Sequence, residues 1–376
     1  MRKPLSRYDG IMGDTAGVFF FFERKRIKKN IQTKKIREFK NMGSVYGNKI
    51  KISVFGESHG EGIGIVIDGF PAGFEVDFEY INEFLKRRAP GGSLSTSRVE
   101  SDTPEILSGI KNGFTTGSPV CAFIRNNNKH SSDYQDKLIN PRPSHADYNA
   151  YVKYNGYSDQ RGGGHFSGRL TAPLVFAGAL CSDWLKKTYD IKINAYLKRV
   201  GEFTNDIPDF MSKVENFISE LKQRGDSVGA VIECVADNIP QGLGEHMFSS
   251  VEAAVSSCVF GIPGVKGIEF GKGFEFASMY GSQANDEYYY DENGDIKTKT
   301  NNNGGIIGGM TSGMPLVFSV VFKPTPSIFT KQNTINLETK SNDKFTIKGR
   351  HDPCIGIRAV PVVEAAAAIA LMDLVL

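Results

Sequence analysis

The stretch of the chain with the clearest chemical potential is residues 161–173, which read RGGGHFSGRLTAP. Three glycines stand between Arg161 and His165, and Arg169 follows just before an apolar run that begins at Leu170. Glycine lets a ligand approach the backbone closely, a helix N-terminus favours negative charge, and arginine donates forked hydrogen bonds to phosphate. The stretch is typical of an anion-binding loop that leads into a helix, although a surface turn with solvated arginines has the same pattern.

Histidine, arginine and glycine recur in other short motifs. These motifs read GESHG at residues 56–60, RPSHAD at 142–147, NNNGGIIGGMTSGMP at 301–315, KPTPS at 323–327 and GRHDPCIGIR at 349–358. Histidine gives or takes protons near neutral pH, so His59 and His145 are candidate proton-transfer groups. The alternatives are turn histidines in solvent, or a nucleophilic Ser58–His59 pair, although adjacent side chains rarely face each other.

Together these residue types indicate an enzyme that acts on a phosphorylated, carboxylated small molecule. Arginines would bind the anionic groups, while the isolated histidines and Asp352 would transfer protons. The glycine-rich loops would line a flat, polyanionic cofactor. The sequence contains no GxxxxGK[ST] motif, and no GxGxxG that follows a strand with an acidic residue downstream. ATP use and a Rossmann-type NAD site are therefore not expected.

Composition narrows the class of protein further. The chain has 376 residues, with 40% hydrophobic and 23% charged residues, which is ordinary for a soluble globular protein. The net charge of +3 is uneven, because residues 1–41 hold 12 Lys/Arg against 4 Asp/Glu (+8) and the rest hold 33 against 38 (−5). The mildly acidic body argues against a nucleic-acid partner. The 5 cysteines lack metal-ligand spacing, so we predict no metal site and a reducing, cytoplasmic location.

The two ends of the chain differ from its body. Residues 1–41 are basic and show no reliable apolar face, so we expect a leader that is disordered or that stems from a misassigned start, with Met42 as the natural start. A basic arm that binds nucleic acid or membrane is the alternative. Val360 to Leu376 is almost wholly apolar but short for a membrane span, and it carries Glu364 and Asp373. We therefore predict a buried C-terminal helix and no membrane partner.

Between these ends, strand and helix signals alternate. Period-two patterns on both sides of residues 56–60 predict a hairpin with a functional turn. Asp77 is a candidate N-cap for a helix that continues to Arg88. The other predicted helices cover residues 146–154, 170–189, 208–224 (with proline in its first turn) and 247–260. The other predicted strands cover residues 105–107, 120–124, 191–200, 228–235, 265–270 and 316–322, with a weaker hairpin at 332–348. Because strand pairs are hairpin-connected, we predict α+β layers and not a doubly wound parallel sheet.

The motifs resemble the chorismate synthase family over nearly all of residues 43–376, and the matching segments also include KPTPSI at 323–328 and GRHDPCIGIRAVPVVEA at 349–365. The resemblance implies one large catalytic domain, with a helical layer sandwiched between two antiparallel β-sheets, in a homotetramer. It implies 1,4-anti elimination of phosphate from 5-enolpyruvylshikimate-3-phosphate to give chorismate. The reaction would need reduced FMN without net redox change, with NADPH as a candidate reductant and a separate flavin reductase as a candidate partner.

The resemblance also implies roles for individual residues. His59 would protonate the reduced flavin or steady its charge, His145 would lie beside the departing phosphate, and Asp352 would act with the flavin in removing the ring proton. The side chains implied to bind substrate anions are Arg88, Arg142, Arg169 and Arg350. Those implied to contact the flavin are His165, Phe166, Ser167, Pro263, Gly264, Gly308, Lys323, Pro324, Thr325, Pro326, Ser327 and Arg350.

The sequence departs from the family pattern at two places. The segment from Ala89 to Ser95 lacks the arginines that many members have and is about one residue short, and His165 stands where members commonly have arginine. Two alternatives to the implied function stay open. One is a flavin-dependent oxidoreductase on the same scaffold, and the other is a non-enzymatic binder of phosphate or RNA that uses the basic arm.

Overall fold

The computed structural model describes residues 43–90, 102–127, 138–347 and 351–376. Residues 44–376 form one compact unit. Three sequence predictions fall outside the described residues: the leader with its start at Met42, the role of Arg350, and most of the short segment from Ala89 to Ser95. The boundary between leader and domain stays a prediction.

The described strands and helices alternate along the chain. The strands are β1 Val45–Tyr46, β2 Lys51–Gly56, β3 Gly62–Asp68, β4 Glu105–Ser108, β5 Ile110–Lys111, β6 Phe114–Thr115, β7 Val120–Arg125, β8 Lys192–Val200, β9 Phe203–Thr204, β10 Ala230–Asp237, β11 Val265–Phe270, β12 Tyr288–Tyr290, β13 Ile296–Thr298, β14 Ile306–Ile307, β15 Met310–Thr311, β16 Leu316–Phe322, β17 Gln332–Asn336 and β18 Ser341–Phe345. The α-helices are α1 Phe78–Arg88, α2 Asp147–Lys153, α3 Thr171–Tyr189, α4 Phe210–Arg224, α5 Val251–Val259, α6 Gly281–Ala284 and α7 Gly356–Val375.

Two five-stranded antiparallel sheets are found among the described residues. The first has the order β1-β2-β3-β7-β4, and the second β11-β16-β10-β8-β9. Strands β2 and β3 form the predicted hairpin, paired from Lys51↔Asp68 to Gly56↔Ile63. Ile63, Ile65 and Ile67 of β3 are all buried. The turn 57–61 connects the ends of these two strands, and the alternating isoleucines of β3 fix which side of the pair is buried.

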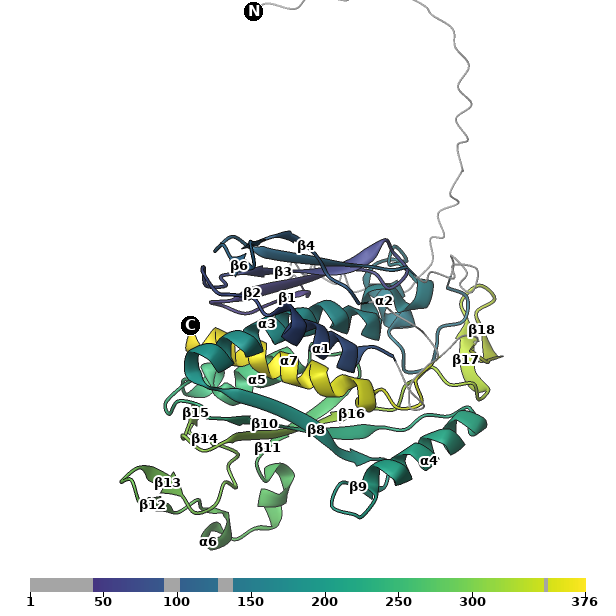
Figure 1. The fold of residues 1–376 in the computed structure, drawn as a ribbon. Coiled ribbons are helices and arrows are strands. Elements are labelled where there is room, and N and C mark those ends of the chain that lie inside the picture. The colour runs from purple at the N-terminus through teal and green to yellow at the C-terminus, as the bar shows by residue number, and fades with distance from the viewer. Residues whose placement is uncertain (1–42, 91–101, 128–137, 348–350) are drawn as a thin grey trace, which may run out of the picture. The chain divides into compact units, whose positions relative to one another are not determined.

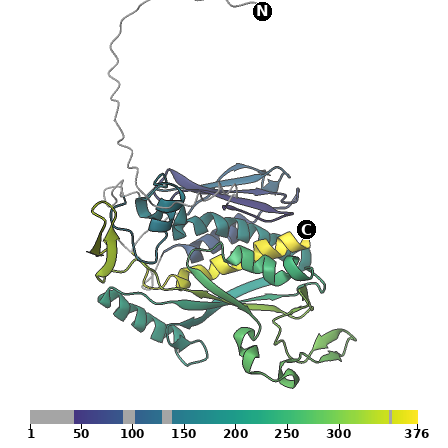
Figure 2. The same ribbon diagram turned by 180° about the vertical axis from the view of Figure 1, so that it is seen from behind.

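Helices pack against both sheets. Helix α3 contacts β3 and β7 of the first sheet and β8 of the second, and α7 contacts α3, β8 and β10. In Figures 1 and 2, α1, α3, α5 and α7 lie between the two sheets. At the α3–α7 contact, a Cβ on Gly178 would lie 2.2 Å from Ala365 Cα, so glycine is required for this approach. The prediction of an α+β protein with antiparallel sheets is confirmed.

Most predicted helices are present, with changes at their ends. Asp77 caps α1 by accepting a hydrogen bond from Tyr80 N at 3.0 Å, as predicted. The predicted helix 247–260 is divided, because Ser250 adopts extended backbone and caps α5. Pro208 lies before the start of α4, so its predicted place in the first turn is wrong. Helix α7 begins at Gly356, before the predicted start, and includes Pro361 in its second turn, where proline cannot donate the usual helical hydrogen bond.

The buried C-terminal helix is confirmed, and its two acids have partners. Glu364 pairs with Arg87 at 2.7 Å and accepts a hydrogen bond from Ala195 N. Asp373 accepts hydrogen bonds from the backbone N–H groups of residues 48–50. Among the described residues, no helix combines the length and the apolar character needed to cross a membrane.

Candidate active site

The glycine-rich loop has a backbone that only glycine adopts readily. Gly162, Gly163 and Gly164 have φ values of +60°, +103° and +53°. The glycines lie inside the short 3₁₀ segment Arg161–Phe166, and a second one, Gly168–Leu170, comes between them and α3. The loop therefore leads into a helix as predicted, but not directly into its N-terminus. Ser58 of the hairpin turn holds the loop, because its N–H donates to Gly164 O at 3.1 Å.

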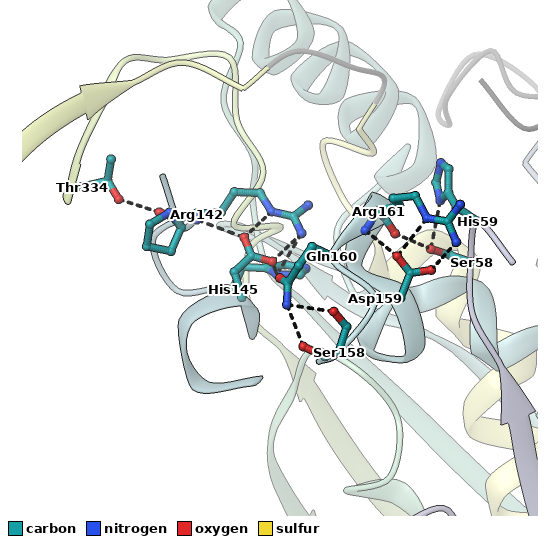
Figure 3. Close-up of polar contacts among 11 residues, drawn as sticks. Ser58, His59, Arg142, His145, Ser158, Asp159, Gln160, Arg161 and Thr334 are labelled. Atoms are coloured by element: carbon teal, nitrogen blue, oxygen red, sulfur yellow. Dashed lines mark hydrogen bonds and ion pairs between the residues drawn. The ribbon is translucent and has the colours of Figure 1, made fainter. Parts of the chain in front are cut away.

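This loop brings the two predicted catalytic histidines together, one on each side. A Cβ on Gly162 would lie 2.1 Å from His59 Cε1, so the ring of His59 lies against this backbone. A Cβ on Gly163 would lie 3.2 Å from His145 Cε1. The turn 56–60 and the segment 142–147, far apart in sequence, thus meet at two adjacent glycines. Figure 3 shows both histidines, with residues 158–161 between them.

His145 belongs to a cluster with Arg142 and Asp147. His145 Nδ1 lies 2.6 Å from Asp147 Oδ1, and Arg142 donates to both Asp147 oxygens at 2.7 Å. An ionised carboxylate only accepts, so Nδ1 carries the proton and Nε2 is the atom left for proton transfer. Burial alone would raise the pKa of Asp147, but the hydrogen bonds from Arg142 and His145 outweigh it and hold that pKa far below its usual value.

His59 lies in a similar setting of hydroxyl, carboxylate and guanidinium. Its Nδ1 is 3.1 Å from Ser58 Oγ, which also donates to Arg161 O at 3.3 Å. The expectation that these adjacent side chains would not face each other is wrong, because the sharp turn directs both toward the glycine loop. Asp159 binds Arg161 at 2.8 Å, and this hydrogen bond lowers the pKa of Asp159 below its usual value, with His59 adding to the effect.

The predicted substrate arginines Arg88 and Arg169 share one carboxylate. Asp102 is ion-paired with both of them and is buried. Asp352 is paired with Arg358 at 2.7 Å, and Arg358 Nε donates to Arg88 O at 3.0 Å. Asp352 is thus joined to the same cluster.

Sequence reasoning missed three polar residues of the site. They are Asp102, Asp159 and Asn126, whose amide donates to Glu57 O and Gly60 O at 2.9 and 3.1 Å. None of these residues lies in one of the motifs described above, because each contacts its neighbour only through the geometry of the folded chain. The excess of arginines over acids in the motifs was the only signal that further carboxylates had to be close by.

Two predicted flavin segments lie side by side. Lys323 N donates to Gly264 O at 2.9 Å, which joins residues 263–264 to residues 323–327. Lys323 Nζ donates to Ser144 O at 2.6 Å, next to His145. Burial and the nearby Lys266 lower the pKa of Lys323. The buried Thr325 Oγ1 has no hydrogen-bond partner among the described residues, so this segment has a polar atom suited to a bound ligand.

The other predicted flavin residues have structural contacts. His165 Nδ1 donates to Gly56 O at 2.8 Å, and its Nε2 lies 2.8 Å from Ser44 Oγ. Ser167 Oγ accepts a hydrogen bond from Arg169 N, and the exposed ring of Phe166 packs on Tyr154. Gly308 lies in the turn between β14 and β15, next to the start of α5. The ring of His165 thus ties the loop to the end of β2.

Comparison with known proteins agrees with this arrangement. The profile of the family described as chorismate synthase matches residues 50–376. The chain is 45% identical over 343 residues to chorismate synthase of Thermococcus gammatolerans, covering 87% of this chain and 96% of that protein. Its identity to chorismate synthase of Aeropyrum pernix is 44% over 351 residues, covering 88% of this chain and 92% of that protein.

A solved structure is also similar to this chain. The crystal structure of a chorismate synthase superposes with a TM-score of 0.69 and 29% identity, covering 88% of this chain and 92% of that one. The resemblance predicted from the motifs is confirmed. The chain belongs to the chorismate synthase family.

Proposed function

We propose that this protein eliminates phosphate from 5-enolpyruvylshikimate-3-phosphate to give chorismate, by a 1,4-anti elimination that needs reduced FMN. Family membership supports an enzyme of the lyase class that acts on a phosphate-bearing substrate. The observation that carries the proposal is the glycine loop with His59 against Gly162 and His145 against Gly163.

In this proposal Arg142 and Arg169 bind the substrate anions, while His145 serves the leaving phosphate. Asp147 keeps a proton on His145 Nδ1, and in the imidazolium form of the ring Nε2–H gives its proton to the departing phosphate. Asp352 accepts the ring proton, with Arg358 fixing its carboxylate. His59 supplies a second titratable ring on the other side of the loop. Arg350 is a further proposed ligand of the substrate and of the flavin.

Reduced FMN, when bound, supplies electron density to the reacting ring without net redox change. We propose that residues 323–327, 263–264 and 165–167 hold it, together with Gly308. Thr325 Oγ1 is buried without a hydrogen-bond partner in the described part of the chain, and Lys323 is partly buried. Both support this site, because a flavin offers hydrogen-bonding atoms and a phosphate.

We also propose the family's helical layer between two sheets as the scaffold, a homotetramer, and a cytoplasmic location. Contacts of α3 with strands of both sheets support the layered scaffold. Phe248 and Phe274 are large and strongly exposed, which favours assembly with further subunits. NADPH or a separate flavin reductase would keep the flavin reduced.

The test is an anaerobic assay of phosphate release from 5-enolpyruvylshikimate-3-phosphate with dithionite-reduced FMN. Release that needs both enzyme and reduced FMN is expected, and absence of release from folded protein would contradict the proposal. A flavin-dependent oxidoreductase would instead consume NADPH steadily with each turnover. A phosphate or RNA binder would release no phosphate at all.

A further inference from the structure

Asp102 lies between two arginines and is the most enclosed group of the cluster. Its Oδ2 accepts a hydrogen bond from Arg88 Nη1, and its Oδ1 accepts one from Arg169 Nη1. The Asp102 side chain is 2% exposed, that of Arg88 4% and that of Arg169 10%. Two guanidinium groups this close repel each other, so the shared carboxylate is what allows both to be buried.

The Arg88 side chain is buried next to the segment that carries Arg169. Arg88 Nε donates to Thr171 Oγ1 at 3.1 Å, and that hydroxyl donates to Gly168 O at 2.7 Å. The Arg88 carbonyl accepts the hydrogen bond from Arg358 Nε. With a side chain 4% exposed and bonded to Asp102 and Thr171, Arg88 is badly placed to bind a substrate from solvent.

Arg169 lies at a junction with the turn that carries His59. Arg169 Nε donates weakly to Asn126 Oδ1 at 3.4 Å. The Asn126 amide nitrogen donates to Glu57 O and Gly60 O, which flank His59. A displacement of Arg169 would therefore also disturb the turn that carries His59.

We propose that Asp102 is a positioning residue that orients Arg169 toward the substrate anions, and that Arg88 acts through Asp102 and does not touch the substrate. This inference rests on the proposed function for the identity of the substrate. It revises the direct substrate contact that the resemblance implies for Arg88.

Chemical rescue of Asp102→Ala tests the proposal. The substitution leaves a space between two guanidinium groups that suits a small carboxylate, and kcat/KM for phosphate release is expected to fall by about 30-fold or more. Sodium formate should restore part of the activity in a saturable way, whereas neutral formamide should not. The matched control is Asp183→Ala, which removes another buried aspartate, paired with Lys187 at 2.8 Å on α3, and should show no response to formate.

A second readout separates this inference from the proposed function. Formate should raise the melting temperature of Asp102→Ala and leave that of the wild type unchanged. If the wild type releases no phosphate, the proposed function is wrong, and the melting temperatures alone decide the inference. Folded Asp102→Ala that keeps wild-type kcat/KM, or that responds to formate in neither assay, would overturn it.

Two further variants complete the test. If Asp102→Ala does not fold, the isosteric Asp102→Asn is expected to raise KM about 10-fold with little change in kcat, and an unchanged KM would overturn the proposal. Arg88→Met added to Asp102→Ala should cost little more activity, because both changes disturb the same contact. Losses that multiply would show that Arg88 binds the substrate itself.

Discussion

At the scale of single residues, the proposed chemistry depends on carboxylates that fix the state of other side chains. Asp147 binds both Arg142 and His145, and its low pKa keeps it ionised over the whole physiological range. It therefore holds the His145 tautomer that leaves Nε2 for proton transfer. The roles implied for His145 and Asp352 stay predictions, now with defined partners.

Asp147→Asn is expected to lower stability at pH 7 by roughly 1–3 kcal/mol, because a charge-assisted contact with Arg142 is lost. The pKa of Asp147 is lower in the folded state than in the unfolded state. Its contribution is thus complete above about pH 4 and is lost as pH falls through the folded-state value. Urea unfolding from pH 7 to pH 3 should show the wild type and the variant converging in acid. Ser250→Ala, which removes an uncharged N-cap of α5, is the control, and its difference from the wild type should not shrink in acid.

His145→Ala and Asp352→Asn are each expected to lower kcat by roughly 10²-fold or more, the usual scale for a lost proton-transfer group. Steady-state phosphate release with reduced FMN measures this. The exposed His246 offers a control, since His246→Ala should leave kcat unchanged. A near-normal rate in either site variant would remove that residue from the catalytic set.

At the scale of elements, the glycine loop and the hairpin turn form one unit. Gly162→Ala is expected to lower kcat and to cost roughly 1–3 kcal/mol of stability, because alanine is strained at positive φ and its Cβ would collide with the His59 ring. Gly113→Ala carries similar backbone strain, at φ +84°, with nothing within 4 Å of its Cβ. Kinetics and thermal unfolding of both variants separate strain from displacement of His59. An equal kcat in the two variants would contradict the role given to this contact.

The sequence predicted correctly the elements in which the local residue pattern agrees with the packing in the folded structure. Strands β11 and β16 have the predicted bounds, because Gly264 and Gly271 flank β11 and Pro315 immediately precedes the apolar strand β16. Helix α7 begins at Gly356, before its predicted start at Val360, and continues through Pro361, although proline removes one backbone donor from the helix. The hairpin β12–β13 is not among the predicted elements, because its residues Tyr288 to Tyr290 are all exposed and show no alternation.

The site was predictable to the extent that motifs carry it. His59, His145 and Arg142 do lie against the glycine loop, while their catalytic and binding roles stay predictions. The contacts made by Asp102, Asn126 and Asp159 depend on how distant segments pack, and no spacing in one sequence encodes that. Likewise, nothing in the sequence indicated that His165 would point at Gly56 O.

At the scale of the whole molecule, the proposed site is confined to residues after position 43. A protein that begins at Met42 is therefore expected to keep the kcat and KM of the full chain in the phosphate-release assay. An RNA or phosphate binder that uses the basic arm would lose its function on the same deletion. Binding of labelled RNA before and after deletion completes the comparison.

The central claim is an elimination of phosphate that regenerates the reduced flavin in each turnover. The most direct measurement is the ratio of phosphate released to reduced FMN oxidised, under strictly anaerobic conditions, with 5-enolpyruvylshikimate-3-phosphate in large excess over FMN. We predict many phosphates released per FMN while the flavin spectrum stays that of the reduced form. One FMN oxidised for each phosphate released, or no phosphate released by folded enzyme, would contradict the account.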